Sequence, residues 1–170
     1  MKKTAAWLVR RALEELDVRF TFGIPGVHNI ELYDELQESE TITPLLVTHE
    51  GGASFMADAY ARISGSPGVL MVVPAAGQTH AMSGVGEAYL DGIPMLIVSG
   101  GVRTDLDHGF QLHELDQQAL MRPLTKGAYR IDSYDEAVAT VYRAWRTALN
   151  GEPGPVFVAV PANLQLLAAD

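Results

Sequence analysis

Glu50 is the ionisable residue whose sequence context best suits chemistry. It lies in the segment VTHEGGASFMADAYARISG, residues 47–65, between an apolar run and the glycines Gly51 and Gly52. The two glycines leave room for a flat molecule to approach the backbone. A carboxyl group facing such a molecule can share or donate a proton. The structural alternative is that a carboxylate in the first turn of a helix favours the helix macrodipole. The residue pattern alone leaves both interpretations open.

Other familiar catalytic patterns are missing from the sequence. There is no G-x-x-x-x-G-K-[ST], no G-x-G-x-x-G after the first predicted strand and no G-x-S-x-G. The histidines lie on different turns without the spacing of metal ligands: His28, His49, His80, His108 and His113. We therefore expect no protein-only metal site. PAAGQTHAMSG, residues 74–84, is a weak candidate for offering backbone N–H groups to a ligand, and an ordinary strand-to-helix turn explains it equally well.

The candidate residues follow strands in a predicted α/β sheet. Apolar spacing predicts helices at residues 3–17, 29–39, 50–64, 77–92, 113–123 and 133–150. Strands are predicted at residues 19–24, 42–49, 68–73, 94–100, 128–131 and 155–160. Runs such as VLMVV and VFVAV are apolar at successive positions, which is typical of parallel strands buried on both faces. We predict a doubly wound, mainly parallel six-stranded sheet with helices on both faces.

Ligands of such sheets bind beyond the carboxyl ends of the strands. The segments that follow the predicted strands are IPGVHN, HEGG, PAAGQTH and GGVRTD. We expect the functional side chains to come from these four turns.

Composition narrows the possible partners. The chain has 170 residues, a formal net charge of −9 and no cysteine. The acidic balance argues against a nucleic-acid partner, and thiol chemistry is excluded. Apolar stretches are too short to span a bilayer, and charged residues interrupt the first helix, so no export signal is expected. We predict a single cytoplasmic domain over residues 1–170.

Several motifs together resemble a known family. They are FGIPGVHN, VTHEGGASFMADAYARISGSPGV, GEAYLDGIPMLIVSG, FQLHELDQQALMRPLTK and PGPVFVAVP. This set is similar to the N-terminal pyrimidine-binding domain of thiamine-diphosphate enzymes, in the branch of acetolactate synthase, pyruvate oxidase and benzoylformate decarboxylase. The resemblance covers residues 3–165, and its most specific part is H-E-x-x-A-x-x-x-A-x-x-Y-A-R.

The resemblance implies roles for named residues. The family glutamate matching Glu50 hydrogen-bonds N1′ of the cofactor's aminopyrimidine, and the 4′-imino group then removes the proton from thiazolium C2. The other residues implied on the cofactor side are Pro25, Gly26, Ala76, Gly77, Thr79 and His80. On the substrate side the implied residues are Val27, Phe110 and Gln111. Ordinary turn chemistry explains Pro25 and Gly26 equally well.

The chain departs from the family pattern at two points. Where relatives commonly read S-G-P-G-A-T-N, residues 74–80 read P-A-A-G-Q-T-H, so His80 replaces an asparagine. His80 could add acid–base function or act only as a substitute hydrogen-bonding group. The family's G-D-G…N-N motif is also missing. We therefore expect the diphosphate group and Mg²⁺ to be held by a partner domain or subunit.

Two functional hypotheses follow. In the first, the chain is the pyrimidine-binding part of a 2-oxo-acid decarboxylase or acetolactate-synthase-like carboligase, as a split subunit or an excised domain, and is inactive without its diphosphate-binding partner. In the second, it is a non-catalytic module that keeps the fold as a binding or assembly partner. We expect the chain to self-associate as a homodimer, or to pair with a partner, through the helices that follow Glu50 and Gly77, because this region contributes to the contact between pyrimidine-binding domains in the family. The alternative is that both helices only pack on their own sheet. The small residues expected at that contact are Ala57, Ala59, Ala61, Ser83, Gly84 and Gly86.

Overall fold

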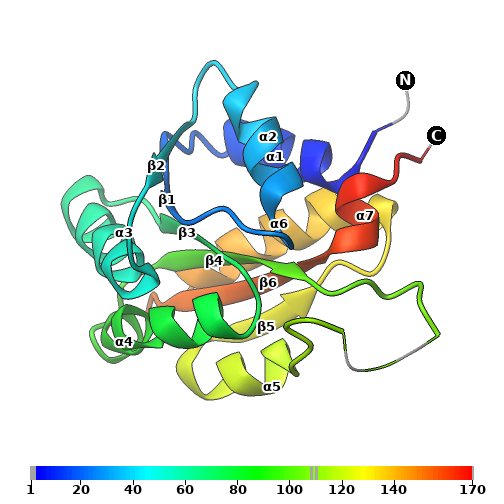
Figure 1. Ribbon diagram of the computed structural model, residues 1–170. Coiled ribbons are helices and arrows are strands. Elements are labelled where there is room, and N and C mark those ends of the chain that lie inside the picture. Colours follow the sequence, from blue (N-terminus) through cyan, green and yellow to red (C-terminus); the bar gives the residue numbers. More distant parts are fainter. Residues whose placement is uncertain (1–2, 108, 110, 170) are drawn as a thin grey trace.

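A computed structural model, which describes residues 3–107, 109 and 111–169, contains the predicted α/β sheet (Figure 1). Its strands lie in the order β2-β1-β3-β4-β6-β5, and every neighbouring pair is parallel. The strands are β1 (Phe20–Gly23), β2 (Thr43–Leu46), β3 (Gly68–Val72), β4 (Met95–Gly101), β5 (Gly127–Arg130) and β6 (Pro155–Pro161). The helices are α1 (Ala5–Glu15), α2 (Ile30–Gln37), α3 (Glu50–Ser64), α4 (Ala76–Leu90), α5 (Gln117–Met121), α6 (Tyr134–Leu149) and α7 (Ala162–Leu166), with a 3₁₀ turn, η1, at Arg122–Leu124. The predicted fold class is confirmed.

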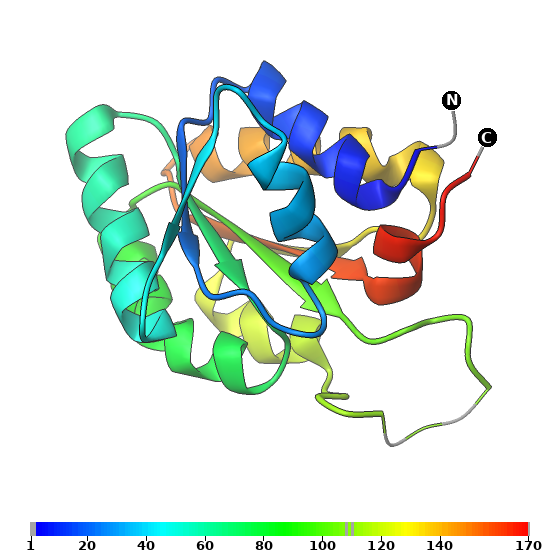
Figure 2. The ribbon, with the colours of Figure 1, turned by 45° about the horizontal axis from the view of Figure 1, so that its top comes forward.

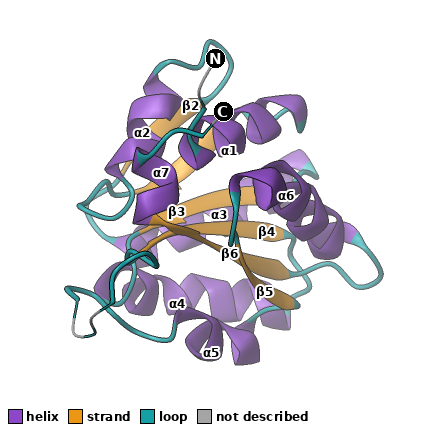
Figure 3. Cartoon of the chain, turned by 90° about the vertical axis from the view of Figure 1, so that its right-hand side faces the viewer, coloured by secondary structure: helices purple, strands orange, loops and turns teal. Residues whose placement is uncertain are grey.

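Two layers of helices enclose the sheet (Figure 3). Helices α1, α2, α6 and α7 cover one face, and α3, α4 and α5 cover the other (Figures 1 and 2). A hydrophobic core lies on each face of the sheet, and strand β3 contributes to both. Val69 and Met71 point into one core, and Leu70 and Val72 point into the other. All residues of β3, β4 and β6 are buried, which explains their unbroken apolar runs. No helix of the described ranges is both long and apolar enough to cross a membrane.

Most boundaries differ from the predicted ones by only a few residues, and the larger differences have physical reasons. Strand β2, expected at residues 42–49, ends at Leu46, because it pairs only with β1, which ends at Gly23. The helix expected at residues 113–123 begins at Gln117. Helix α7 was not predicted, since five residues after Pro161 are too few to show a helical period.

The parallel pairing brings the carboxyl ends of all six strands to one edge of the sheet. The segments following β1, β2, β3 and β4 therefore leave the sheet on the same side (Figure 2). These are the four turns in which the sequence predicted the functional residues.

Candidate functional site

Glu50 is the first residue of α3, where the chain leaves the edge strand β2 and turns into a helix. His49 caps this helix: its backbone is extended, and its Nδ1 accepts a hydrogen bond from the Gly51 N–H at 3.0 Å. The cap fixes the direction in which α3 starts and hence where the Glu50 side chain is presented. That side chain is 14% exposed. A molecule outside the chain can therefore contact the Glu50 carboxylate.

His80 is the direct side-chain contact of Glu50. Its Nδ1 lies 3.3 Å from Glu50 Oε2, and His80 is the more exposed partner. The ring of His80 also stacks on the ring of His49, with centroids 5.3 Å apart. The residue that departs from the family pattern is thus in contact with the predicted catalytic carboxyl group. His80 could be singled out from the sequence because it departs from the family pattern. Its stacking with His49 could not be predicted, because that contact depends on how α3 and α4 pack.

Gly77 forms the other wall beside Glu50. A Cβ at Gly77 would lie 3.4 Å from Glu50 Oε1 and 2.7 Å from Val73 Cγ2. A Cβ at Gly26 would lie 2.7 Å from Val73 Cγ1, so Val73 contacts both turns. The turns after β1, β2 and β3 therefore converge, as the sequence predicted. A side chain at Gly26 or at Gly77 would clash with Val73, and one at Gly77 would also lie against the Glu50 carboxylate.

The turn after β1 is fixed by a side chain. The Gly26 N–H donates to Asn29 Oδ1 at 2.7 Å, and Asn29 Nδ2 donates to the Ile24 carbonyl at 3.3 Å. This pair of bonds is typical of the way asparagine stabilises turns. The turn holds Pro25 and Val27 at the surface, with Val27 71% exposed. An apolar side chain so placed has contact area available for a ligand or partner.

Ala75 starts α4 with an unusual backbone. Its φ is 55° and its ψ is −102°, and it is the N-cap residue of α4. Left-handed φ values favour glycine, which is the residue the family pattern carries at this position. Thr79 Oγ1 donates to the Ala76 carbonyl within the first turn, at 3.0 Å. Ala76 and Thr79 are both exposed next to Gly77, as expected for residues around a site.

Tyr33 is a candidate residue that the sequence analysis missed. Its side chain comes from α2, and its buried hydroxyl has no hydrogen-bond partner in the described part of the chain. Burial raises the pKa of Tyr33 above its ordinary value, and the nearby charge of Glu50 raises it further. The hydroxyl therefore stays protonated and can donate. In the sequence Tyr33 looks like another apolar position of an amphipathic helix.

The predicted substrate side lies in the segment between β4 and α5. Gln111 is bound to its own segment: Oε1 accepts from the Arg103 N–H at 3.2 Å, and Nε2 donates to the Arg103 carbonyl at 3.0 Å. Among the described residues, Gln111 makes no hydrogen bond to Glu50 or to the residues that surround Glu50. Phe110 lies outside the described residues. The assignment of Gln111 to a substrate side stays a prediction.

Comparison with known proteins identifies the family of this chain. The sequence model of the N-terminal TPP-binding domain of thiamine pyrophosphate enzymes matches residues 3–120. The chain belongs to this family. Among curated relatives of this TPP-binding domain, the acetolactate synthase large subunit of Haemophilus influenzae is 35% identical over 96% of the chain and 29% of its own length. The probable 2-ketoarginine decarboxylase of Pseudomonas aeruginosa is 39% identical over 98% of the chain and 30% of its own length. The chain thus spans less than a third of these relatives.

The residues of this TPP-binding domain fit the cofactor that the family name implies. Gly77 lies against the Glu50 carboxylate without a side chain between them, and the buried Tyr33 hydroxyl has no partner in the described ranges. A nitrogen heterocycle with donor and acceptor groups on one edge suits such a lining. Within the described part of the chain, no three His, Asp or Glu side chains are placed to hold a metal ion.

Proposed function

We propose that this chain supplies the pyrimidine-binding half of a thiamine diphosphate site in a 2-oxo-acid decarboxylase or an acetolactate-synthase-like carboligase. The observation that carries the proposal is the position of Glu50, with Gly77 on one side and His80 on the other. Bound thiamine diphosphate supplies the carbon nucleophile and the electron sink for such reactions. The chain's own residues bind and orient the ring.

Each of these residues has a separate task. Glu50 holds or donates a proton at N1′ of the aminopyrimidine, which is general acid–base chemistry at a defined atom. Gly26 and Gly77 present backbone without a side chain to the flat ring, and exposed Val27 excludes water on one side of it. His80 keeps the Glu50 carboxylate oriented through its 3.3 Å contact. We place His80 next to Glu50 as a positioning residue.

The second half of the site comes from a diphosphate-binding domain or subunit. The chain spans only 28–30% of the relatives named above and of the Escherichia coli acetolactate synthase isozyme 3 large subunit, which leaves room in such proteins for a further domain. We assign the diphosphate group and Mg²⁺ to that partner. The names of the relatives point to 2-oxo acids as the substrate class.

A second copy of the chain is the expected partner of α3 and α4. Large apolar side chains are exposed on their outer surfaces: Phe55, Met56, Ile63, Tyr89 and Leu90. Of the small residues predicted for the contact, three are used inside the chain. Ala57 and Ala61 are buried in its own core, and a Cβ at Gly84 would lie 2.4 Å from Ser54 Oγ. The exposed apolar residues remain available for a homodimer. Light scattering across a concentration series tests this, and a strictly monomeric chain would contradict it.

A chimera tests the catalytic proposal. This chain replaces the matching N-terminal segment of the Pseudomonas aeruginosa relative, and carbon dioxide release from 2-oxo acids is measured with thiamine diphosphate and Mg²⁺. We expect decarboxylation by the chimera and none by the relative without its N-terminal segment. A folded chimera that binds the cofactor but releases no carbon dioxide would refute the catalytic proposal. It would favour the non-catalytic module.

A further inference from the structure

His28 and His113 form a contact between two turns at the carboxyl edge of the sheet, and neither residue has a role in the proposed function. Their ring centroids lie 5.2 Å apart, and the ring planes are tilted by 45°. His28 belongs to the turn after β1, whereas His113 belongs to residues 111–116, which precede α5. The contact therefore joins two segments that are far apart in the sequence.

The turn that carries His28 is fixed from two sides. A Cβ at Gly100, near the end of β4, would lie 1.8 Å from the His28 carbonyl oxygen, so the strand and the turn are in direct backbone contact. The same carbonyl accepts a hydrogen bond from Gln165 Nε2, in α7, at 2.9 Å. His28 as a whole is only 7% exposed. His28 is therefore the fixed half of the pair.

The segment that carries His113 is fastened to this turn by its ring. His113 is the one residue of positions 112–116 that is not exposed. Its φ is 63°, in the left-handed region that residues other than glycine seldom adopt. The hydrogen bonds of Gln111 go to Arg103 and Glu114, which lie in the same stretch between β4 and α5. His113 is therefore the movable half of the pair.

The groups packed around His28 do not balance a positive charge on its ring. Strand β4 and helix α7 reach His28 through residues that carry no charge. Among the described residues, the one ion pair between a histidine and a carboxylate joins His80 to Glu50. Glu31, the acidic residue in the first turn of α2, therefore forms no such pair with His28. The titratable group whose charge acts on His28 is His113.

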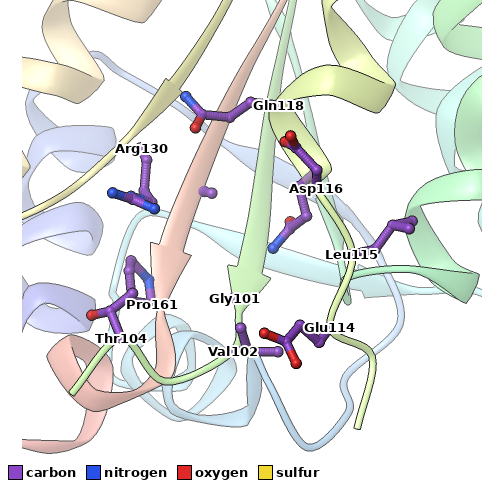
Figure 4. A pocket seen from close by; sticks show the side chains of 11 residues that line it. Gly101, Val102, Thr104, Glu114, Leu115, Asp116, Gln118, Arg130 and Pro161 are labelled. Carbon is purple, nitrogen blue, oxygen red and sulfur yellow. The ribbon is translucent and has the colours of Figure 1, made fainter. Parts of the chain in front are cut away.

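The acidic residues next to His113 in the sequence face elsewhere. Glu114 and Asp116 line, together with Arg130, a cavity beyond the carboxyl ends of β4, β5 and β6 (Figure 4). Each of the two carboxylates also accepts a hydrogen bond from a backbone N–H at 2.9 Å. Within the described ranges, neither forms an ion pair with His113. A charge on the histidine pair thus has no nearby counter-charge.

Protonation is therefore unfavourable while the two rings are in contact. Burial lowers the pKa of His28, and the neighbouring charge of His113 lowers it further. The Nδ1 atom of each ring is buried and has no hydrogen-bond partner among the described residues. An added proton would thus lie in a position without solvent, beside a second imidazole. Acid favours a conformation in which the rings separate and water reaches them.

We propose that His28 and His113 form a pH-sensitive latch, which holds residues 111–116 against the turn after β1 at neutral pH and releases them on acidification. A histidine switch needs an element with two packings that differ in their affinity for protons, and this segment is such an element. Release also frees His113 from its left-handed backbone. The latch is a property of the chain itself and does not rest on the proposed function.

The pH range of the latch follows from the pKa of His28. Because that pKa is lowered only while the rings are in contact, the docked segment is fully favoured above the ordinary value of 6.5. This advantage is lost as the pH falls from 6.5 towards the lowered value. The turn after β1 also carries exposed Val27. Release therefore changes the surroundings of a residue that the proposed function places beside the cofactor.

NMR of the whole chain without cofactor tests the latch. A nuclear Overhauser contact between the two rings should be present at about pH 7.5 and lost at about pH 5. The amide shifts of residues 111–116 should change with the same midpoint as the His28 ring, below 6.5. Amides of β3 should keep their shifts. A ring contact that persists when His28 is protonated, or a change of the β3 amides with the same midpoint, would overturn the proposal.

Substitutions at the two rings give matched comparisons. H28F keeps an aromatic ring that cannot take a proton, so the contact between the rings at positions 28 and 113 should persist at about pH 5. H113Q, at the more exposed partner, should raise the midpoint of His28 towards 6.5, because a neighbouring charge is removed. The control H80Q removes a histidine outside the pair and should change neither result. Release of the segment in a folded H28F chain, or an unchanged His28 midpoint in H113Q, would contradict the latch.

Discussion

Glu14 and Glu50 are two carboxylates of similar burial that the fold treats in opposite ways. Their side chains are 11% and 14% exposed. Glu14 Oε1 accepts from Arg10 at 2.8 Å and from Ser39 at 2.7 Å, and its Oε2 accepts from Arg11 at 2.5 Å. Among the described residues, Glu50 has one side-chain hydrogen-bonding partner, a half-exposed histidine at 3.3 Å. The two side chains are similarly buried, and they differ in the number of hydrogen bonds that they already make.

The largest expected effect is that of E50Q on catalysis. In the chimera we expect kcat to fall by about 10²- to 10⁴-fold at saturating cofactor, because the amide cannot exchange a proton at the ring nitrogen. The free energy of unfolding should change by less than about 1 kcal/mol, since a single long contact to an exposed partner contributes little. Steady-state kinetics and urea unfolding measure the two quantities. An E50Q chimera as active as its parent would remove Glu50 from the mechanism.

The same substitution at Glu14 should give the reverse result. We expect E14Q to cost about 2 kcal/mol of stability, because it weakens hydrogen bonds to charged groups and leaves Arg10 without one of its partners. Catalysis in the chimera should be unchanged. Urea unfolding at pH 7 measures the cost. If E14Q and E50Q destabilised the chain equally, the contrast between the two carboxylates would fail.

The loss in E14Q should also depend on pH. Burial alone would raise the pKa of Glu14, but the bonds from Ser39 and Arg10 hold that pKa below its ordinary value of 4.5. A lowered folded-state pKa stabilises the fold above the unfolded-state value, and the stabilisation is lost as the pH falls through the folded-state value. The difference between E14Q and the parent should therefore be full at pH 7 and shrink as the pH falls below 4.5. A constant difference would contradict the ionic origin of the effect.

The smallest expected effect is that of A75G. Glycine relieves the left-handed backbone at the start of α4 but gains more freedom in the unfolded chain, so we expect a net stabilisation of about 1 kcal/mol. The control is A59G, at an exposed position inside α3, which should destabilise the chain by a similar amount. Urea midpoints measure both. Destabilisation by A75G would show that the surroundings favour alanine at this position.

The layered sheet and the place of the site could be predicted from the sequence because both depend on local pattern. Apolar runs marked the central strands, and breakers such as the Pro25–Gly26 pair and Gly77 marked the turns at the carboxyl edge. The end of β2 could not be predicted, since it depends on where its one neighbour stops. Strand length at an edge depends on pairing more than on composition.

Contacts within the site were harder to predict than its location. The stacking of His49 on His80 and the closeness of Tyr33 to Glu50 join residues on different helices. No spacing along the chain encodes such contacts, because they arise only when α2, α3 and α4 are placed against the sheet. Nothing in the sequence marks Glu114 and Asp116 as neighbours of Arg130 either. Only the fold shows that they share a cavity with Arg130.

The pairing of β4 with β6 determines when the sheet can be completed during synthesis. Met95 lies opposite Pro155, 60 residues later, and β5 reaches the sheet only by pairing with β6. Closing so long a loop costs conformational entropy. The step is slow because the contacts between β4 and β6 that offset this cost form only once the loop has closed. A ribosome-bound chain that has not yet exposed residue 155 therefore carries β4 with an open edge and β5 with no neighbour. Such an intermediate keeps an unpaired strand edge until β6 emerges and completes the six-stranded sheet.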